Sequence, residues 1–194
     1  MAKLYIAFLF ISFLLSSIFP LSIAFTRRKV DPLTAGPVRY APPLHVAKKS
    51  AVLHFYVHDV GGNNGTVWEV AQAEITTNYR SLGQVVVMDH KLTNKPNKNS
   101  LEVGRVQGMV ASTGLREMAM TLSMNFVFTL GKFKGSTLSV LGWLSVNQKK
   151  RELPVLGGTG VFRMARGYII SNTYSFDPIK NYGILEYTIY VYYT

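Results

Sequence analysis

Asp59 is the residue of this sequence best placed to do chemistry. It ends a run in which every second side chain is apolar, so on a β-strand its carboxylate would share one face with Leu53, Phe55 and Val57. If that face lines a cavity, Asp59 would be partly removed from water, which favours the protonated acid and suits a proton donor or acceptor. The alternative is structural, since aspartate also caps turns and a Gly/Asn-rich segment follows at once.

Metal, nucleotide and nucleophile sites are not indicated. His54 and His58 face away from Asp59 and lie four residues apart, which on a strand is roughly 13 Å and too far to share an ion. No other cluster of His, Cys and carboxylate residues has ligand spacing. The Gly-Gly-Thr-Gly segment 157–160 lacks the ending of a P-loop and the helix of a dinucleotide site, so it predicts a glycine hairpin. No serine or cysteine lies in a nucleophile elbow. The sequence therefore predicts no metal and no cofactor.

Alternating apolar and polar residues predict the strands that would position these side chains. Period-two alternation covers residues 52–59, 84–89, 138–146, 161–173 and 184–193. Residues 115–129 have a helix-like composition, but the Met, Leu and Phe residues from 118 to 128 occupy every second position, which gives a single apolar face only on a strand. Regularly spaced strands separated by turn residues predict an all-β barrel or sandwich.

The N-terminal region predicts export. Lys3 precedes an almost wholly apolar run over residues 4–19, and Pro20 then leads to the small residues of a cleavage site that ends at Ala24. A membrane anchor is the alternative, but the run is slightly short for a span of roughly 20 residues. We therefore expect a signal peptide at 1–24, a proline-rich flexible arm at 25–48 and one folded domain at 49–194.

Composition supports a secreted globular domain. Of 194 residues, 48% are hydrophobic and none is cysteine, so the domain must be held by its core without disulfides. The formal charge of +11 permits nucleic-acid binding, but the basic residues are dispersed. For an exported protein we expect a polyanionic cell-wall matrix as the acidic neighbour, and no nucleic acid. The sequon at Asn64 lies in a Gly/Asn-rich turn and predicts a glycosylation site.

The chain resembles the plant dirigent proteins in six sequence blocks that follow the order of that family. These blocks are FYVHD at 55–59, VGRVQG at 103–108, MNFVFT at 124–129, GSTLSV at 135–140, RELPVLGGTG at 151–160 and FRMARGY at 162–168. The resemblance implies an eight-stranded antiparallel β-barrel of the calycin or allene-oxide-cyclase type, with an N-terminal extension and an open, ligand-sized interior. It also implies export to the apoplast and a homo-oligomer, either a dimer or a trimer.

The resemblance further implies a function without an oxidative centre. A separate laccase or peroxidase makes phenoxy radicals from monolignols such as coniferyl alcohol, and the barrel holds them so that coupling gives one enantiomer, in lignan and other phenylpropanoid biosynthesis. Some relatives instead promote ring closure through a quinone methide, for which an acid and a cation are natural tools. A binding-only barrel, which carries an apolar phenolic or attaches to a cell-wall component, is the alternative from another class.

Site residues follow from the resemblance one by one. Asp59 matches the acid of the first block, and Arg151 matches an arginine that would bind a phenolate or quinone-methide oxygen; its structural alternative is the surface end of a Lys-Lys-Arg run. Asp89, Arg105 and Phe128 match further positions, to which we assign substrate binding.

Three departures from the family pattern bear on substrate. Members that form pinoresinol have an aspartate seven residues before the arginine, where this chain has Leu144. Val110 replaces an aromatic residue, and His90 with Lys91 follows Asp89 where a second aspartate and a proline are frequent. We therefore expect a less acidic cavity that is more apolar in places, which argues against pinoresinol formation.

Overall fold

The computed structural model describes residues 49–75 and 82–194; the predicted signal peptide and arm lie outside this range. The described residues form nine strands and two single-turn 3₁₀ helices. The strands are β1 (Lys49–Val60), β2 (Val67–Ala71), β3 (Val85–Thr93), β4 (Glu102–Ser112), β5 (Ala119–Phe128), β6 (Thr137–Ser145), β7 (Arg151–Thr159), β8 (Arg166–Asp177) and β9 (Tyr182–Tyr193). The helices are η1 (Gly131–Phe133) and η2 (Gly160–Phe162). Neither helix, and no other segment of this part of the chain, could cross a membrane as a helix.

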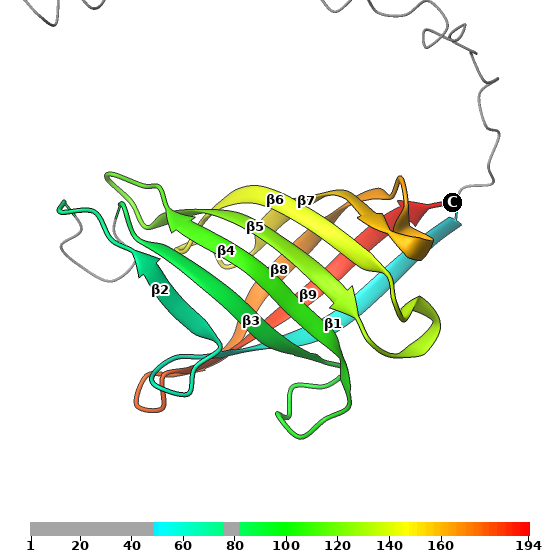
Figure 1. Cartoon of the computed structure of the whole chain (residues 1–194), viewed down its shortest axis with the longest axis horizontal. Coiled ribbons are helices and arrows are strands. Elements are labelled where there is room, and N and C mark those ends of the chain that lie inside the picture. The colour runs from blue at the N-terminus through cyan, green and yellow to red at the C-terminus, as the bar shows by residue number, and fades with distance from the viewer. Residues whose placement is uncertain (1–48, 76–81) are drawn as a thin grey trace, which may run out of the picture. The chain divides into compact units, whose positions relative to one another are not determined.

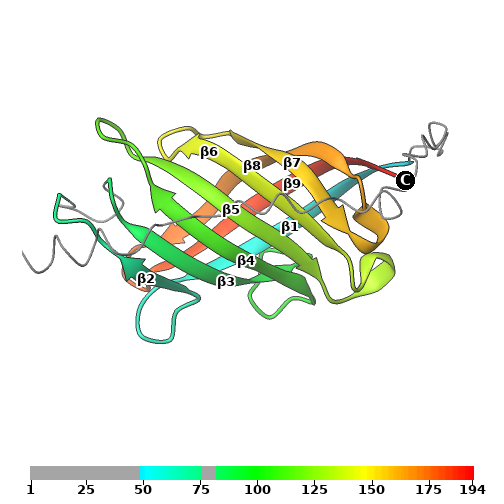
Figure 2. The same cartoon turned by 45° about the horizontal axis from the view of Figure 1, so that its top comes forward.

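Eight of the strands close into an antiparallel barrel, which confirms the predicted fold. The order runs β1-β9-β8-β7-β6-β5-β4-β3, and β1 pairs again with β3 to close the circle (Figures 1 and 2). The closing seam is short: β1 pairs with β3 only at Tyr56, Val57 and His58, whereas β1 and β9 are in register from Lys49 to Val60. Beyond His58, β1 leaves β3, and β2 pairs with the remaining half of β3 as a ninth strand.

Residues 119–128 form a strand within the predicted range of 115–129, with Leu122, Met124, Phe126 and Phe128 all buried. Near the glycine-rich block, the strands differ from the sequence predictions in two places. The glycine hairpin expected at 157–160 is wrong, because Gly157 to Thr159 continue β7 and pair with Ser139 to Thr137 of β6. The chain turns only afterwards, through η2 and Met164 at a φ of 62°, so β8 begins at Arg166 and not at 161.

One end of the barrel is packed with aromatic rings. Phe133 and Phe162, from the two 3₁₀ helices, lie 4.7 Å apart between ring centroids, and Phe162 also contacts Phe128 and Tyr193 at 5.6 and 5.3 Å. Phe162 is fully buried, and Phe128 is almost so. Rings at these separations pack favourably in addition to the apolar area they bury. This end is solid core, which leaves the opposite end to hold a site.

Candidate functional site

The opposite end of the barrel contains a cavity of about 330 Å³. Its wall is built from the ends of strands that meet there: the C-terminal ends of β1, β4, β6 and β8, and the N-terminal parts of β3, β5, β7 and β9. The polar lining residues are Asp59, Gln84, His90, Ser112, Arg151, Ser171, Thr173 and Tyr187. Valine, leucine and methionine side chains make up most of the remainder, including Met88, Met120 and Met124. A cavity of this size with a mostly apolar lining is typical of a small-molecule site.

Asp59 and Arg151 both line this cavity, from β1 and β7 respectively. The turn after Asp59 is closed by backbone bonds, with Gly65 N–H donating to Gly62 O and Thr66 N–H to Val60 O at 2.8 and 2.7 Å. Arg151 is not at a surface end of its basic run: only 8% of it is exposed, and Nη2 donates to Thr173 Oγ1 at 2.9 Å. The cavity thus holds one carboxyl group and one guanidinium.

Tyr187 is a cavity residue that the sequence analysis did not single out. It is buried in β9, and this burial raises the pKa of its phenol to about 12; the Asp59 charge adds to the shift, and the Arg151 charge opposes it. Tyr187 therefore keeps its proton and can act as a hydrogen-bond donor. Its only sequence signal is its place on the apolar face of the last strand.

His90 is a second residue of the cavity wall that was not predicted as a site residue. It is buried in β3, and its Nδ1 lies 2.7 Å from Thr66 Oγ1. Burial lowers the pKa of His90, although the charges of Asp59 and Asp89 oppose the shift. An imidazole in this setting is neutral near pH 7, so it is a hydrogen-bonding group and not a cation.

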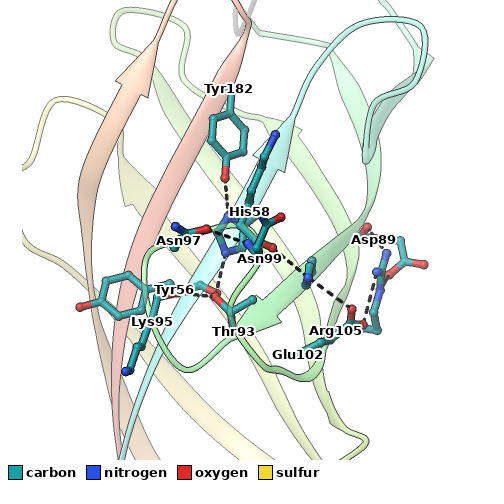
Figure 3. A network of polar contacts seen from close by, with 12 residues as sticks. Tyr56, His58, Asp89, Thr93, Lys95, Asn97, Asn99, Glu102, Arg105 and Tyr182 are labelled. Carbon is teal, nitrogen blue, oxygen red and sulfur yellow. Dashed lines mark hydrogen bonds and ion pairs between the residues drawn. The ribbon is translucent and has the colours of Figure 1, made fainter.

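The other predicted site residues lie elsewhere. Asp89 and Arg105 are outside the barrel, where Arg105 Nε donates to Asp89 Oδ1 and Nη2 to Asp89 O, both at 2.7 Å (Figure 3). Partial burial alone would raise the pKa of Asp89, but hydrogen bonds from Arg105 and Gln107 outweigh this effect and lower the pKa. Phe128 belongs to the aromatic end, and Asn64 lies in an exposed turn. Of the predicted residues, the structure places Asp59 and Arg151 in the cavity and pairs Asp89 with Arg105 outside it.

Figure 3 also shows a polar network on the outer side of the seam, centred on His58. The Tyr182 hydroxyl contacts His58 Nδ1, and His58 Nε2 lies 2.8 Å from Thr93 Oγ1. Because the Thr93 hydroxyl donates to Lys95 O at 2.7 Å, it accepts from His58 Nε2–H. His54 instead contacts Glu186, with Nε2 and Oε1 2.9 Å apart. Among residues 49–75 and 82–194, no three His, Cys, Asp or Glu residues are grouped to hold a metal.

All three departures from the dirigent pattern reach the cavity. His90, Val110 and Leu144 each contribute to its wall, from β3, β4 and β6. Val110 lies directly opposite Leu122 of β5, and Leu144 opposite Met120 of the same strand, so this side is apolar. The three departures therefore change the wall of the cavity itself.

Comparison with known proteins gives consistent matches. The family model described as Dirigent-like protein matches residues 51–192. Dirigent protein 1 of Arabidopsis thaliana is 40% identical over 186 residues, which cover 95% of this chain and 97% of that protein. Pterocarpan synthase 1 of Glycyrrhiza echinata is 40% identical and covers 75% of this chain and 79% of its own length. The solved structure of the pterocarpan synthase dirigent protein GePTS1 superposes with a TM-score of 0.71 at 38% identity, covering 77% of this chain and 87% of that one.

Proposed function

The chain belongs to the dirigent-like protein family, and from that premise we propose that its cavity binds a small phenolic intermediate and sets the stereochemistry of the bond formed there. The observation that carries the proposal is the presence of one acid, Asp59, and one cation, Arg151, in a largely apolar cavity. An apolar wall restricts how a phenolic can lie, while a few fixed polar groups select one orientation.

Ring closure of a quinone methide is the reaction that this pair of side chains supports best. A hydroxyl oxygen of the substrate attacks the methide carbon, the electron pair of the exocyclic double bond moves to the carbonyl oxygen, and that oxygen gains a proton while the attacking oxygen loses one. No electrons are gained or lost overall. Arg151 would stabilise the oxygen that becomes negative, and Asp59 would exchange the proton. The similarity to pterocarpan synthases supports this version of the proposal.

Coupling of two phenoxy radicals is the second candidate, with coniferyl alcohol as the substrate type and a laccase or peroxidase as the radical source. The observation that favours it is the apolar part of the wall, where Met88, Met120 and Met124 offer polarisable contacts to aromatic rings. Such a surface can orient two rings without supplying a proton. In this version the protein acts as a stereodirecting auxiliary in lignan biosynthesis and not as an oxidase.

Chiral chromatography of products tests the proposal and separates its two versions. One reaction contains coniferyl alcohol and a one-electron oxidant; the other contains a hydroxybenzyl alcohol that loses water to a quinone methide and closes through a neighbouring hydroxyl. We expect the protein to produce an enantiomeric excess in the second reaction, whose product should be racemic without it. Racemic products from both reactions would contradict stereodirection.

Variants at the two polar residues test the site itself. Asp59→Asn removes the carboxyl group that would exchange the proton and Arg151→Ala removes the cation, and each should lower the rate of the directed reaction by roughly 10²- to 10³-fold, as for other lost acids or oxyanion donors. Phe128→Leu is the matched control, because Phe128 lies in the aromatic end and should leave the product ratio unchanged. An unchanged ratio in both Asp59→Asn and Arg151→Ala would show that both assignments are wrong.

Export to the apoplast, cleavage after Ala24, a glycan on Asn64 and assembly into a dimer or trimer also belong to the proposal. The residues at 1–24 support export, and the exposed turn at Asn64 is accessible to a glycosyltransferase. The mass of protein purified from culture medium, before and after glycan removal, checks the cleavage and the glycan together. A mass that includes residues 1–24 would contradict cleavage.

A further inference from the structure

The point where β1 separates from β3 places His90 next to Asp59. The β1–β3 register pairs Tyr56 with Thr93, Val57 with Leu92 and His58 with Lys91, so the next opposed positions are Asp59 and His90. The ladder ends before them, but both side chains line the cavity. Directly opposed residues on one face of an antiparallel pair have Cβ atoms roughly 5 Å apart when the pairing continues. Both side chains therefore face the same cavity where the strands separate, close enough for the Asp59 charge to act on the His90 ring.

Thr66 closes the gap that the parting strands leave. Its backbone is fixed to both of them, because its N–H donates to Val60 O at 2.7 Å and Asp89 N–H donates to its carbonyl at 2.8 Å. Its hydroxyl oxygen accepts from Val60 N–H at 3.1 Å and lies 2.7 Å from His90 Nδ1. Thr66 thus holds the His90 ring from one side, and neither strand can move away without breaking one of these bonds.

The distances around the Thr66 hydroxyl decide which tautomer His90 adopts. The hydroxyl has one proton, for which His90 Nδ1 at 2.7 Å and the His58 carbonyl at 3.4 Å compete. A separation of 2.7 Å is typical of an O–H donor and short for an N–H donor, whereas 3.4 Å is long for O–H···O. The shorter contact favours donation from the hydroxyl to Nδ1, which then lacks a proton. The proton of the neutral ring is then on Nε2.

From this geometry we propose that Thr66 fixes His90 in its neutral Nε2–H form, and that Nε2–H donates a hydrogen bond to an acceptor oxygen of the cavity ligand. The inference rests on the proposed function and adds a third polar contact to Asp59 and Arg151. Within the described residues no hydrogen bond occupies Nε2. A donor fixed in place before the ligand arrives needs no reorganisation during the reaction.

This donor constrains the chemistry of the ligand. At the same position the dirigent pattern frequently has an aspartate, and an ionised carboxylate can only accept hydrogen bonds. His90 reverses that polarity, so the part of the ligand that meets it should be a carbonyl, ether or phenolate oxygen and not a group that needs an acceptor. The carbonyl oxygen of a quinone methide fits this requirement, because negative charge develops on it during ring closure.

Nitrogen-15 NMR of the histidine rings tests the tautomer in the free, full-length protein at pH 7. We expect the pattern of a neutral Nε2–H ring for His90, and a mixture of the two tautomers in Thr66→Val, which keeps the side-chain shape but lacks the hydroxyl. Thr113→Val is the matched control: its hydroxyl contacts Thr121, away from the seam, and its loss should leave His90 unchanged. A neutral Nδ1–H ring or an imidazolium in the wild-type protein would overturn the assignment.

Ligand binding tests the second half of the proposal, with coniferyl aldehyde as the probe because it carries carbonyl, ether and phenol oxygens. Binding should shift the His90 Nε2–H resonance, and His90→Asp should weaken the affinity by roughly tenfold, the order expected when a hydrogen bond is lost and an acceptor faces an acceptor. His90→Asn, which keeps an N–H donor, should weaken it less.

The result distinguishes this inference from the proposed function. If the aldehyde perturbs methionine signals of the cavity but leaves His90 unperturbed, and the Asp and Asn variants bind equally well, His90 is not a ligand donor. If the aldehyde does not bind to the wild-type protein at all, the proposed phenolic function fails. The tautomer measured in the free protein still confirms or overturns the role of Thr66 in that case.

Discussion

Arg151 illustrates how a single residue places a charge in the cavity of this barrel. Arginine is almost never fully buried unless it is paired, because a charge removed from water is costly. Here the side chain is 8% exposed, and Thr173 holds one of its nitrogens. Because a guanidinium carries five N–H donors, it can hold Thr173 and contact a ligand oxygen at once. An oxygen anion that forms in the cavity would therefore lower the electrostatic cost of this buried cation.

The two buried histidines make the stability of the protein pH-dependent. Burial and, to a smaller extent, the Lys91 charge lower the pKa of His58, and burial lowers the pKa of His90 despite Asp59 and Asp89. In the unfolded chain both rings titrate near their usual value of about 6.5. As the pH falls below about 6.5, the unfolded chain binds protons that the folded chain does not, so the free energy of unfolding decreases until the folded pKa values are reached. Above about 6.5 this contribution is fully present.

Urea unfolding at pH 7.5 and 5.5 measures this effect. The wild-type protein should be less stable at pH 5.5, and a His58→Gln, His90→Gln variant, which has no titrating group at either position, should lose less stability between the two pH values. The variant should also be less stable at pH 7.5, because it leaves the buried Thr93 and the half-buried Tyr182 and Thr66 without their histidine partners; a buried polar group left unsatisfied costs about 1–3 kcal/mol. An equal pH-dependent loss in both proteins would contradict the assignment to these rings.

At the residue scale, the sequence predicted the groups whose position followed from alternation alone. Asp59 was predicted correctly to end an apolar row, because β1 is regular up to the seam. His90 follows the same alternation, but its importance depends on Thr66, which reaches it only through the folded turn. Asp89 and Arg105 face outward. Asp89 is next to His90 in β3, so their side chains lie on opposite faces of the strand, and no sequence pattern showed which face would be internal.

At the element scale, close contacts with neighbouring atoms explain one of the two adjacent glycines of β7. A Cβ on Gly158 would lie 2.1 Å from Thr137 O and 2.8 Å from Phe162 Cβ, distances that atoms do not tolerate. A Cβ on Gly157 would meet only the end of the Arg166 side chain, at 3.5 Å. Only one of the two glycines is therefore required by packing, although both lie in the same strand.

Replacing each glycine by alanine should separate these two roles. We expect Gly158→Ala to lower the free energy of unfolding by roughly 1–3 kcal/mol, because the β6–β7 ladder or η2 must shift to admit the methyl group. Gly157→Ala should change it by no more than about 0.5 kcal/mol, as is usual for substitutions that disturb no packing. Urea unfolding of the two variants measures both values. A loss of similar size in the two proteins would show that the close approach at Gly158 is not limiting.

The same close contacts explain which strands the sequence did not predict. β5 and β9 have long uninterrupted alternation, and both were predicted. Alternation does not predict β4 or β7, because glycine and proline interrupt their patterns. Yet a Cβ on Gly108 of β4 would lie 2.1 Å from Ser123 O of β5. Glycine at such positions permits neighbouring backbones to approach and does not end the strand. β2 was missed because its side chains are mostly exposed.

At the scale of the whole molecule, the barrel has one end packed with aromatic rings and one end that contains a cavity. The aromatic end is filled by rings from β5, η1, η2 and β9, while the other end keeps a cavity of about 330 Å³. The resemblance to dirigent proteins implied a barrel with a ligand-sized interior, but not which end would be filled. That outcome depends on η1 and η2, two single turns that insert Phe133 and Phe162 into the barrel and that have no periodic signal of their own.

Truncating one large side chain at each end tests this division. Phe162→Ala removes a fully buried ring that contacts three others, so it should lower the free energy of unfolding by about 3–5 kcal/mol. Leu144→Ala should cost only about 2 kcal/mol, at the low end of the range for buried leucine, because this side chain already borders empty space and loses fewer contacts. Affinity for coniferyl aldehyde should show the reverse pattern. It should change in Leu144→Ala, which alters the wall of the cavity, and stay unchanged in folded Phe162→Ala, which does not. Urea unfolding and titration of both variants measure the two quantities. Equal stability losses, or an altered affinity in folded Phe162→Ala, would mean that the two ends are coupled, since closely packed interiors transmit strain between distant positions.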